Sequence, residues 1–150
     1  MARLIITAAQ LRVVDYEATH AWPAECCGLL FGAETDAGDR VVTHVLPSPN
    51  LFAGDKRQGY TLDPRALLVA ERFASRGLAT LGLYHSHPQP PASPSETDRA
   101  AGTFGWSYLI VALADGRVVE TKSFRLADDG SHFEAEVITK QDDEPDAGTA

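Results

Sequence analysis

Residues 82–88 read Gly-Leu-Tyr-His-Ser-His-Pro, and they close an apolar run that begins at Leu78. The run predicts a strand, in which alternate side chains point to the same face. We therefore expect His85 and His87 to project together, with the small Ser86 on the opposite face. Two imidazoles at this spacing are suited to binding a divalent metal ion.

The segment that follows is expected to bring a carboxylate back to the two histidines. Prolines at positions 88, 90, 91 and 94 make it stiff and non-helical, because each proline fixes its own φ and lacks a backbone donor. Ser95 then opens a short helix that has Asp98 in its first turn. His85, His87 and Asp98 thus form a three-ligand set for a divalent metal, with a fourth position free for water.

Each part of this pattern also has a structural interpretation. A histidine pair at the end of a strand can be surface polarity. Ser95 followed by Asp98 resembles a helix cap, although a capping box prefers Glu or Gln at the last position. The complete pattern is His-x-His-Pro, six residues, Ser, two residues and Asp, which is much harder to obtain by chance.

These residues resemble the JAMM signature of the MPN-plus metalloproteases. That family also carries a glutamate ahead of a glycine-containing apolar strand, and here Glu25 precedes Cys-Cys-Gly-Leu-Leu-Phe-Gly at 26–32. The resemblance extends from about Thr7 to about Ala127. It implies a single-domain α/β fold with a curved, partly barrel-like mixed sheet packed by helices, similar to the deaminase architecture.

The remaining sequence predicts helices interspersed with strands. Strands are expected at 3–6, 26–31, 41–46, 78–84, 106–113, 118–126 and 132–139, and helices at 8–20, 64–76 and 95–101. The hairpins after residue 106 imply antiparallel pairs, so the sheet is mixed. We expect one domain over 1–140 and a disordered acidic tail over 141–150.

The composition narrows the classes of function. A chain of 150 residues suits a single domain, and a net charge of −8 with a pI of about 5.0 argues against contact with nucleic-acid phosphates. No apolar run approaches the roughly 20 residues of a membrane span, and the N-terminus lacks the pattern of a signal peptide. We therefore expect a cytoplasmic protein without nucleic-acid or membrane partners, whose oligomeric state the sequence does not define.

The two cysteines, Cys26 and Cys27, are adjacent in the sequence. Neighbouring cysteines would close a strained ring, and there is no CxxC motif. We expect both to be buried, reduced and packed as small apolar side chains. The functional alternative is a thiol nucleophile.

Two neutral imidazoles, one carboxylate and an open position are typical of catalytic zinc, which lowers the pKa of its water toward ~7. That water needs a base, and Asp98 cannot serve while it ligates the metal. Glu25 is the candidate for this base, and the resemblance implies the same role for the matching glutamate. The alternative is that Glu25 is an exposed carboxylate at a strand end.

The resemblance also implies a role for Ser95, which would donate a hydrogen bond to the oxyanion formed during amide hydrolysis. Since Ser95 is also the expected N-cap, we expect its hydroxyl to serve only one of these two roles.

The residues and the resemblance together predict a zinc-dependent metallopeptidase or isopeptidase. The family cleaves bonds after the C-terminal Gly-Gly of ubiquitin-like β-grasp proteins, and its small prokaryotic-type members resemble this chain most, with sulfur-carrier proteins as the implied substrates. We expect the irregular stretch at 47–59 to help seat the substrate tail.

Three other functions are weighed against this one. A non-catalytic MPN-type binding module would have lost the ligands, which this chain keeps. A cupin-type oxygenase needs a glutamate soon after the histidine pair, whereas the next acid here is Glu96. A cysteine protease using Cys26 or Cys27 would be sensitive to thiol alkylation and not to a chelator.

Overall fold

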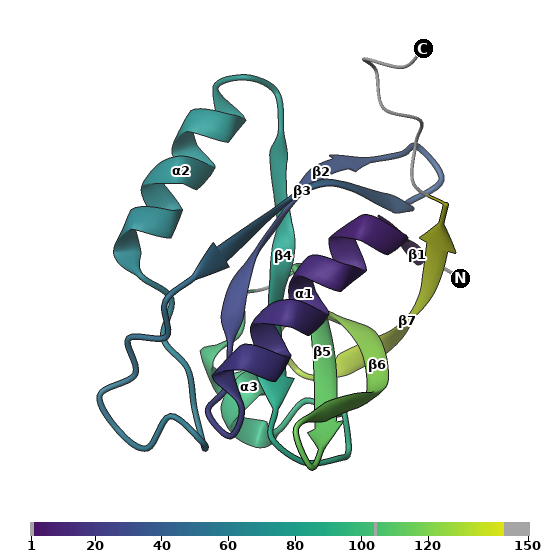
Figure 1. The fold of residues 1–150 in the computed structure, drawn as a ribbon. Coiled ribbons are helices and arrows are strands. Elements are labelled where there is room, and N and C mark those ends of the chain that lie inside the picture. Colours follow the sequence, from purple (N-terminus) through teal and green to yellow (C-terminus); the bar gives the residue numbers. More distant parts are fainter. Residues whose placement is uncertain (1, 104, 143–150) are drawn as a thin grey trace, which may run out of the picture.

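A computed structural model describes residues 2–103 and 105–142, in which helices pack against a strongly curved sheet (Figure 1). The strands are β1 (Arg3–Thr7), β2 (Cys27–Glu34), β3 (Arg40–Ser48), β4 (Ala79–His87), β5 (Ser107–Ala114), β6 (Arg117–Leu126) and β7 (Phe133–Gln141). The helices are α1 (Ala8–Ala21), α2 (Pro64–Ala74) and α3 (Glu96–Ala101). No helix in these two ranges is long and apolar enough to cross a bilayer.

The strands close into a barrel in the order β1-β3-β2-β4-β5-β6-β7, and β7 pairs with β1. β4 lies between antiparallel β2 and parallel β5. β1 is parallel to both of its neighbours, whereas β5, β6 and β7 form antiparallel hairpins. The predicted α/β fold with a mixed, curved sheet is therefore confirmed, and the barrel closes fully.

The two longer helices cover opposite faces of β2 and β4. Leu30 and Tyr84 pack in the core cluster that includes the buried face of α1, whereas Leu29 and Leu83 pack in the cluster beneath α2. Neighbouring residues of a strand point to opposite faces, which explains this division. His85 and His87 lie on the same face as Leu83, as the alternation predicts.

Two glycines let β4 pack tightly against both neighbours. A Cβ atom at Gly28 of β2 would lie 2.4 Å from carbons of the Tyr84 ring, and one at Gly82 would lie 1.8 Å from the Ser107 carbonyl oxygen. Both distances are far shorter than a van der Waals contact. The resulting register places Cys27 opposite His85, which brings the start of β2 to the histidine pair.

The predicted starts of the longer helices and the first of the predicted hairpins after residue 106 are confirmed. Thr7 caps α1 through a capping box with Gln10, and Asp63 caps α2 ahead of a proline. Asp115 and Gly116 adopt positive φ values of 51° and 78° in the turn between β5 and β6.

Several predicted boundaries were wrong. The strand expected at 26–31 continues to Glu34, and the strand expected at 78–84 continues to His87. A Cβ at Gly32 would lie 1.9 Å from the Val41 carbonyl oxygen, so this glycine serves a close strand contact at a bulge. At the other end, Gln141 still belongs to β7, and residues 143–150 of the expected tail lie outside the described residues.

Candidate active site

β4 carries His85 and His87 to the same side of the sheet. Their Nε2 atoms are 3.1 Å apart, and the ring of His85, which is fully buried, stacks on Tyr60 with centroids 4.6 Å apart. The hydroxyl of Ser86 points the other way and accepts a hydrogen bond from the backbone N–H of Cys26 at 2.8 Å. The strand thus fixes both imidazoles while Ser86 ties it to the start of β2.

Asp98 reaches the two histidines from the first turn of α3. Its Oδ2 atom lies 3.5 Å from Nε2 of His85 and 3.6 Å from Nε2 of His87. In a tetrahedral zinc site with bonds of about 2.0–2.1 Å, two ligand atoms are about 3.3–3.4 Å apart. The triangle of donor atoms therefore has the size and the chemistry that a zinc ion requires.

The protonation of the three side chains also bears on metal binding, which uses neutral imidazole and ionised carboxylate. Burial lowers the pKa of His85. Burial alone would raise the pKa of Asp98, but its contacts with the two histidines and with the Ser95 N–H hold it well below its usual range. Burial alone would also lower the pKa of His87. The contacts of His87 with Asp98 and with the Pro91 carbonyl outweigh burial, so the pKa of His87 is raised. A metal ion therefore competes with a proton at His87.

The orientation of the His87 ring is set by its other nitrogen. Nδ1 lies 3.0 Å from the carbonyl oxygen of Pro91, an acceptor, so Nδ1 carries a proton, and in the neutral imidazole Nε2 keeps its lone pair. In His85, by contrast, Nδ1 is buried without a hydrogen-bond partner among the described residues.

Ser95 is the N-cap of α3. Its Oγ accepts a hydrogen bond from the backbone N–H of Asp98 at 3.0 Å, and its own N–H donates to Oδ2 of Asp98 at 2.8 Å. Aspartate thus fills the capping-box position for which Glu or Gln is preferred. Because a hydroxyl carries one proton as well as two lone pairs, capping leaves the donor available, contrary to our expectation that one role excludes the other.

Glu25 is buried at the start of β2, with only 8 % of its surface exposed, so the alternative of an exposed strand-end carboxylate was wrong. Its N–H donates to the Lys56 carbonyl at 2.7 Å, and its carbonyl accepts from the Asn50 side chain at 2.9 Å. Burial raises the pKa of Glu25 to about 7; nearby His87 opposes this rise and Asp98 adds to it. These are the properties of a carboxyl group able to exchange a proton near neutral pH.

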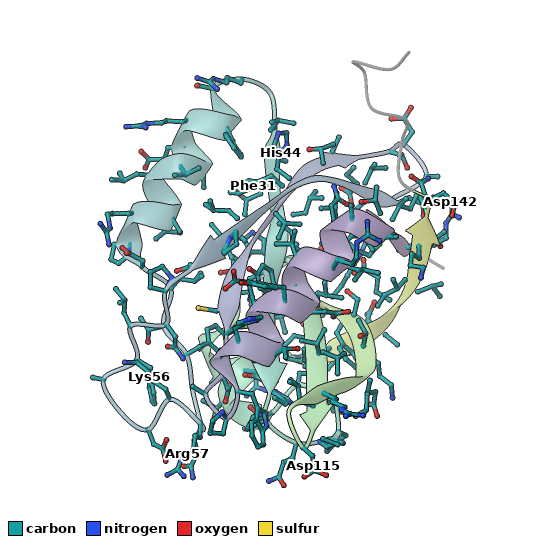
Figure 2. All side chains as sticks on the ribbon, in the orientation of Figure 1. Phe31, His44, Lys56, Arg57, Asp115 and Asp142 are labelled. Carbon is teal, nitrogen blue, oxygen red and sulfur yellow. The ribbon has the colours of Figure 1, made fainter. Side chains whose placement is uncertain are left out.

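Glu25, His87, Ser95 and Asp98 line one cavity of about 710 Å³. The irregular stretch at 47–59 contributes Phe52, Arg57, Gln58 and Gly59 to the wall of this cavity. Figure 2 shows Lys56 and Arg57 at the outer part of this loop. The sequence pattern did not point to the rest of the wall, which includes Tyr60, Leu62, Leu67, Leu83, Trp106 and Tyr108. These side chains come from separate elements and meet only in the folded chain.

Cys26 and Cys27 are free, buried thiols. Burial is the main cause that raises the pKa of Cys26 to about 11 and that of Cys27 to about 12. A nucleophilic cysteine needs a lowered pKa and an accessible sulfur. Neither thiol has these properties, so the structure gives no support to the cysteine-protease alternative.

Comparison with known proteins identifies the family. Residues 7–127 match the family described as prokaryotic homologs of the JAB domain. The chain belongs to this family. The match confirms the predicted resemblance and its extent, from about Thr7 to about Ala127.

Relatives of this JAB-family protein include peptidases. A desampylase from Haloferax volcanii is 41% identical over 98 residues, which cover 64% of this chain and 67% of that protein. A CysO-cysteine peptidase from Mycobacterium tuberculosis is 30% identical over 127 residues, 83% of this chain and 84% of that protein. A protein from Desulfitobacterium hafniense, solved in solution, superposes with a TM-score of 0.78 at 34% identity, covering 93% of this chain and 94% of that one.

Proposed function

We propose that this JAB-family protein is a zinc-dependent peptidase or isopeptidase. Its substrate would be the bond that follows the C-terminal Gly-Gly of a ubiquitin-like or sulfur-carrier β-grasp protein. One observation carries the proposal: His87 and Asp98, two members of the donor triangle with His85, line the same cavity as the buried Glu25.

Zinc is the metal that the donor set fits best, because two imidazoles, one carboxylate and an open position are the usual ligands of a catalytic zinc site. When bound, zinc supplies an activated water and polarises the scissile carbonyl. His87 would present Nε2 to it, with Nδ1–H anchored on Pro91. Asp98 would ligate through the carboxylate that also caps α3.

Glu25 is proposed as the general base and acid. With a pKa of about 7, it is able to take a proton from the attacking water and to return that proton to the leaving amine. Its burial keeps the carboxyl away from bulk water. The two hydrogen bonds on its backbone fix it just ahead of β2, and it lines the same cavity as His87 and Asp98.

Ser95 is proposed to support the oxyanion. The Oγ atom of Ser95 accepts a hydrogen bond from the backbone N–H of Asp98. This contact holds the hydroxyl in place at the N-cap of α3. The hydroxyl proton can then donate to the oxygen that gains charge when the carbonyl is attacked. Helix cap and oxyanion donor are thus compatible roles of one side chain.

The cavity suits an extended peptide tail. The apolar side chains of Phe52, Leu62, Leu67 and Trp106 form part of its wall. A tail that ends in two glycines has no side chains that would collide with the buried donor atoms. The similarity to a desampylase and to a CysO-cysteine peptidase supports this class of substrate. A cytoplasmic location stays a prediction.

The proposal is tested by incubating the zinc-loaded full chain with the host's own sulfur-carrier and ubiquitin-like proteins, each extended by a short C-terminal peptide. Mass spectrometry should find a product that ends at Gly-Gly for at least one of them. Cleavage should stop with a chelator and return with zinc. Carriers whose last glycine is replaced by valine serve as controls and should resist. Zinc-loaded protein that cleaves none of the carriers would contradict the proposal, as would cleavage that a chelator does not affect.

A further inference from the structure

One peptide group links His87 to a carboxylate on another strand. The carbonyl oxygen of Pro91 accepts from Nδ1 of His87 at 3.0 Å, and the N–H of Ala92, on the other side of the same peptide bond, donates to Oε1 of Glu120 at 3.0 Å. The connection therefore runs from imidazole to peptide to carboxylate. Glu120 lies on β6 and outside every motif that the sequence analysis singled out.

Burial makes this link hard to replace. Ala92 is completely buried and packs with Ile110, Ala112 and the partly buried Phe124. Its N–H would lose its partner if Glu120 were truncated, and buried backbone donors are almost always paired. Half-exposed Lys122 lies 3.5 Å from the same carboxylate, so Glu120 keeps a counter-ion at the surface.

The segment between His87 and Ser95 is held by few other hydrogen bonds. The prolines between His87 and Ser95 have no N–H, so this stretch makes few backbone hydrogen bonds. On its other side, the indole N–H of Trp22 donates to the Pro88 carbonyl at 3.1 Å. The Ala92 contact is the one that acts on the peptide group bonded to His87.

We propose that Glu120 is a positioning residue for the metal ligand His87 and acts through the Pro91–Ala92 peptide. This rests on the proposed metal site. A carboxylate that accepts from a peptide N–H polarises the whole peptide group, and its carbonyl becomes a stronger acceptor. The Pro91 carbonyl then holds Nδ1–H of His87 more firmly and makes Nε2 a better donor to the metal. In many metal sites a carboxylate contacts the ligating histidine directly with the same effect; here a peptide group stands between them.

The test measures zinc affinity of the full chain by competition with a chromophoric chelator, without any substrate. Glu120→Ala should weaken zinc binding by about 10- to 100-fold, the usual range for loss of such a partner. Glu120→Gln keeps an acceptor but loses the charge, and should weaken binding by a smaller factor. Lys122→Met removes the ion pair and leaves the Ala92 contact, so it serves as the matched control and should bind zinc like the wild type.

A second readout separates positioning from a general loss of structure. Cobalt substituted for zinc should show altered visible absorption bands in Glu120→Ala and normal bands in Lys122→Met. Zinc binding by Glu120→Ala within twofold of the wild type would overturn the inference while leaving the proposed function intact. Failure of the wild type to bind zinc would instead overturn the proposed function. Should Glu120→Ala not fold, Glu120→Gln decides: weaker binding supports the inference, and unchanged binding overturns it.

Discussion

The Oδ2 atom of Asp98 accepts a hydrogen bond from the backbone N–H of Ser95 at 2.8 Å, while Oγ of Ser95 accepts one from the backbone N–H of Asp98 at 3.0 Å. The same Oδ2 atom faces both candidate histidine ligands. Helix capping therefore sets the position of the third candidate ligand. This explains the Ser-x-x-Asp spacing, because the two residues occupy the N-cap and N3 positions of a capping box.

Replacement of Ser95 should separate its two roles. Ser95→Gly removes the hydroxyl. Glycine is tolerated at the N-cap position, so the variant should lose only about a few tenths of a kcal/mol of stability. Turnover should fall by about 10²- to 10³-fold, the typical effect of losing one oxyanion donor. Thermal unfolding and zinc content should change little. Ser95→Thr, which keeps both the acceptor and the donor, is the control. Equal turnover of Ser95→Gly and wild type would leave Ser95 as a cap alone.

Removal of a histidine ligand should remove the metal. Purified protein is expected to contain about one zinc per chain, consistent with one donor triangle. His87→Ala should lose that zinc, because two remaining ligands bind it weakly. Elemental analysis of the variants gives the answer. Full zinc occupancy in the double variant His85→Ala/His87→Ala would show that the metal binds elsewhere.

Glu25→Gln should stop turnover and keep the metal. The amide is nearly isosteric with the carboxyl group but cannot accept the proton, so single-turnover cleavage should slow by at least about 10²- to 10⁴-fold. Substrate affinity should change much less, and the variant should bind its β-grasp substrate as an inert trap. Cleavage near the wild-type rate at full zinc content would make Glu25 a bystander. Loss of zinc would instead make it a ligand.

The buried Glu25 should also make the metal-free protein sensitive to pH. Its pKa is about 7 in the folded chain and about 4.5 in the unfolded chain. The folded state therefore binds this proton more tightly, and the wild type loses stability as the pH rises from about 4.5 to about 7. Metal-free Glu25→Gln has no such loss. It should be more stable than the wild type by about 1–3 kcal/mol at pH 8, with the difference shrinking toward pH 5.

Denaturant unfolding of the metal-free proteins at several pH values measures this difference. Glu71→Gln, which makes the same chemical change at an exposed side chain on α2, is the matched control. A stability difference between Glu25→Gln and wild type that stays constant from pH 5 to pH 8 would argue against a raised pKa at Glu25.

The two thiols should be dispensable for catalysis. Cys26 packs in the apolar cluster beneath α1, and the sulfur of Cys27 lies 3.8 Å from the carbonyl oxygens of Ser48 and Pro49. Cys26→Ala suits the first environment, and Cys27→Ser offers a hydroxyl donor to the second. The double variant should keep most of the wild-type activity and resist alkylating agents. Lost catalysis with intact fold and zinc would revive the cysteine-protease hypothesis.

Features with a local cause could be predicted from the sequence. Thr7 with Gln10 and Asp63 with Pro64 mark helix starts through contacts within one turn, and Asp115-Gly116 marks a hairpin through its own backbone preference. The grouping of His85, His87 and Asp98 was predictable for the same reason. Strand alternation, a stiff proline-rich segment and a helix cap act over short stretches of chain.

Features that depend on contacts between distant segments could not be predicted. Closure of the barrel requires β1 to pair in parallel with β7, and neither strand carries a local sign of its partner. The stacking of Tyr60 on His85 and the link from Glu120 to Ala92 are contacts of the same kind. Gly32 resembles a turn residue locally, and only its close approach to Val41 shows that it belongs to a strand.

The chain positions of the site residues have a consequence for how the protein folds. His85, His87 and Asp98 are close in sequence, so the donor triangle can assemble with a small loss of chain entropy. Glu25 joins them only when β2 has docked on β4 and Cys27 lies opposite His85. A chain that has assembled the triangle but not the barrel therefore lacks the proposed base. The proposed hydrolysis then requires a chain in which β2 has docked on β4.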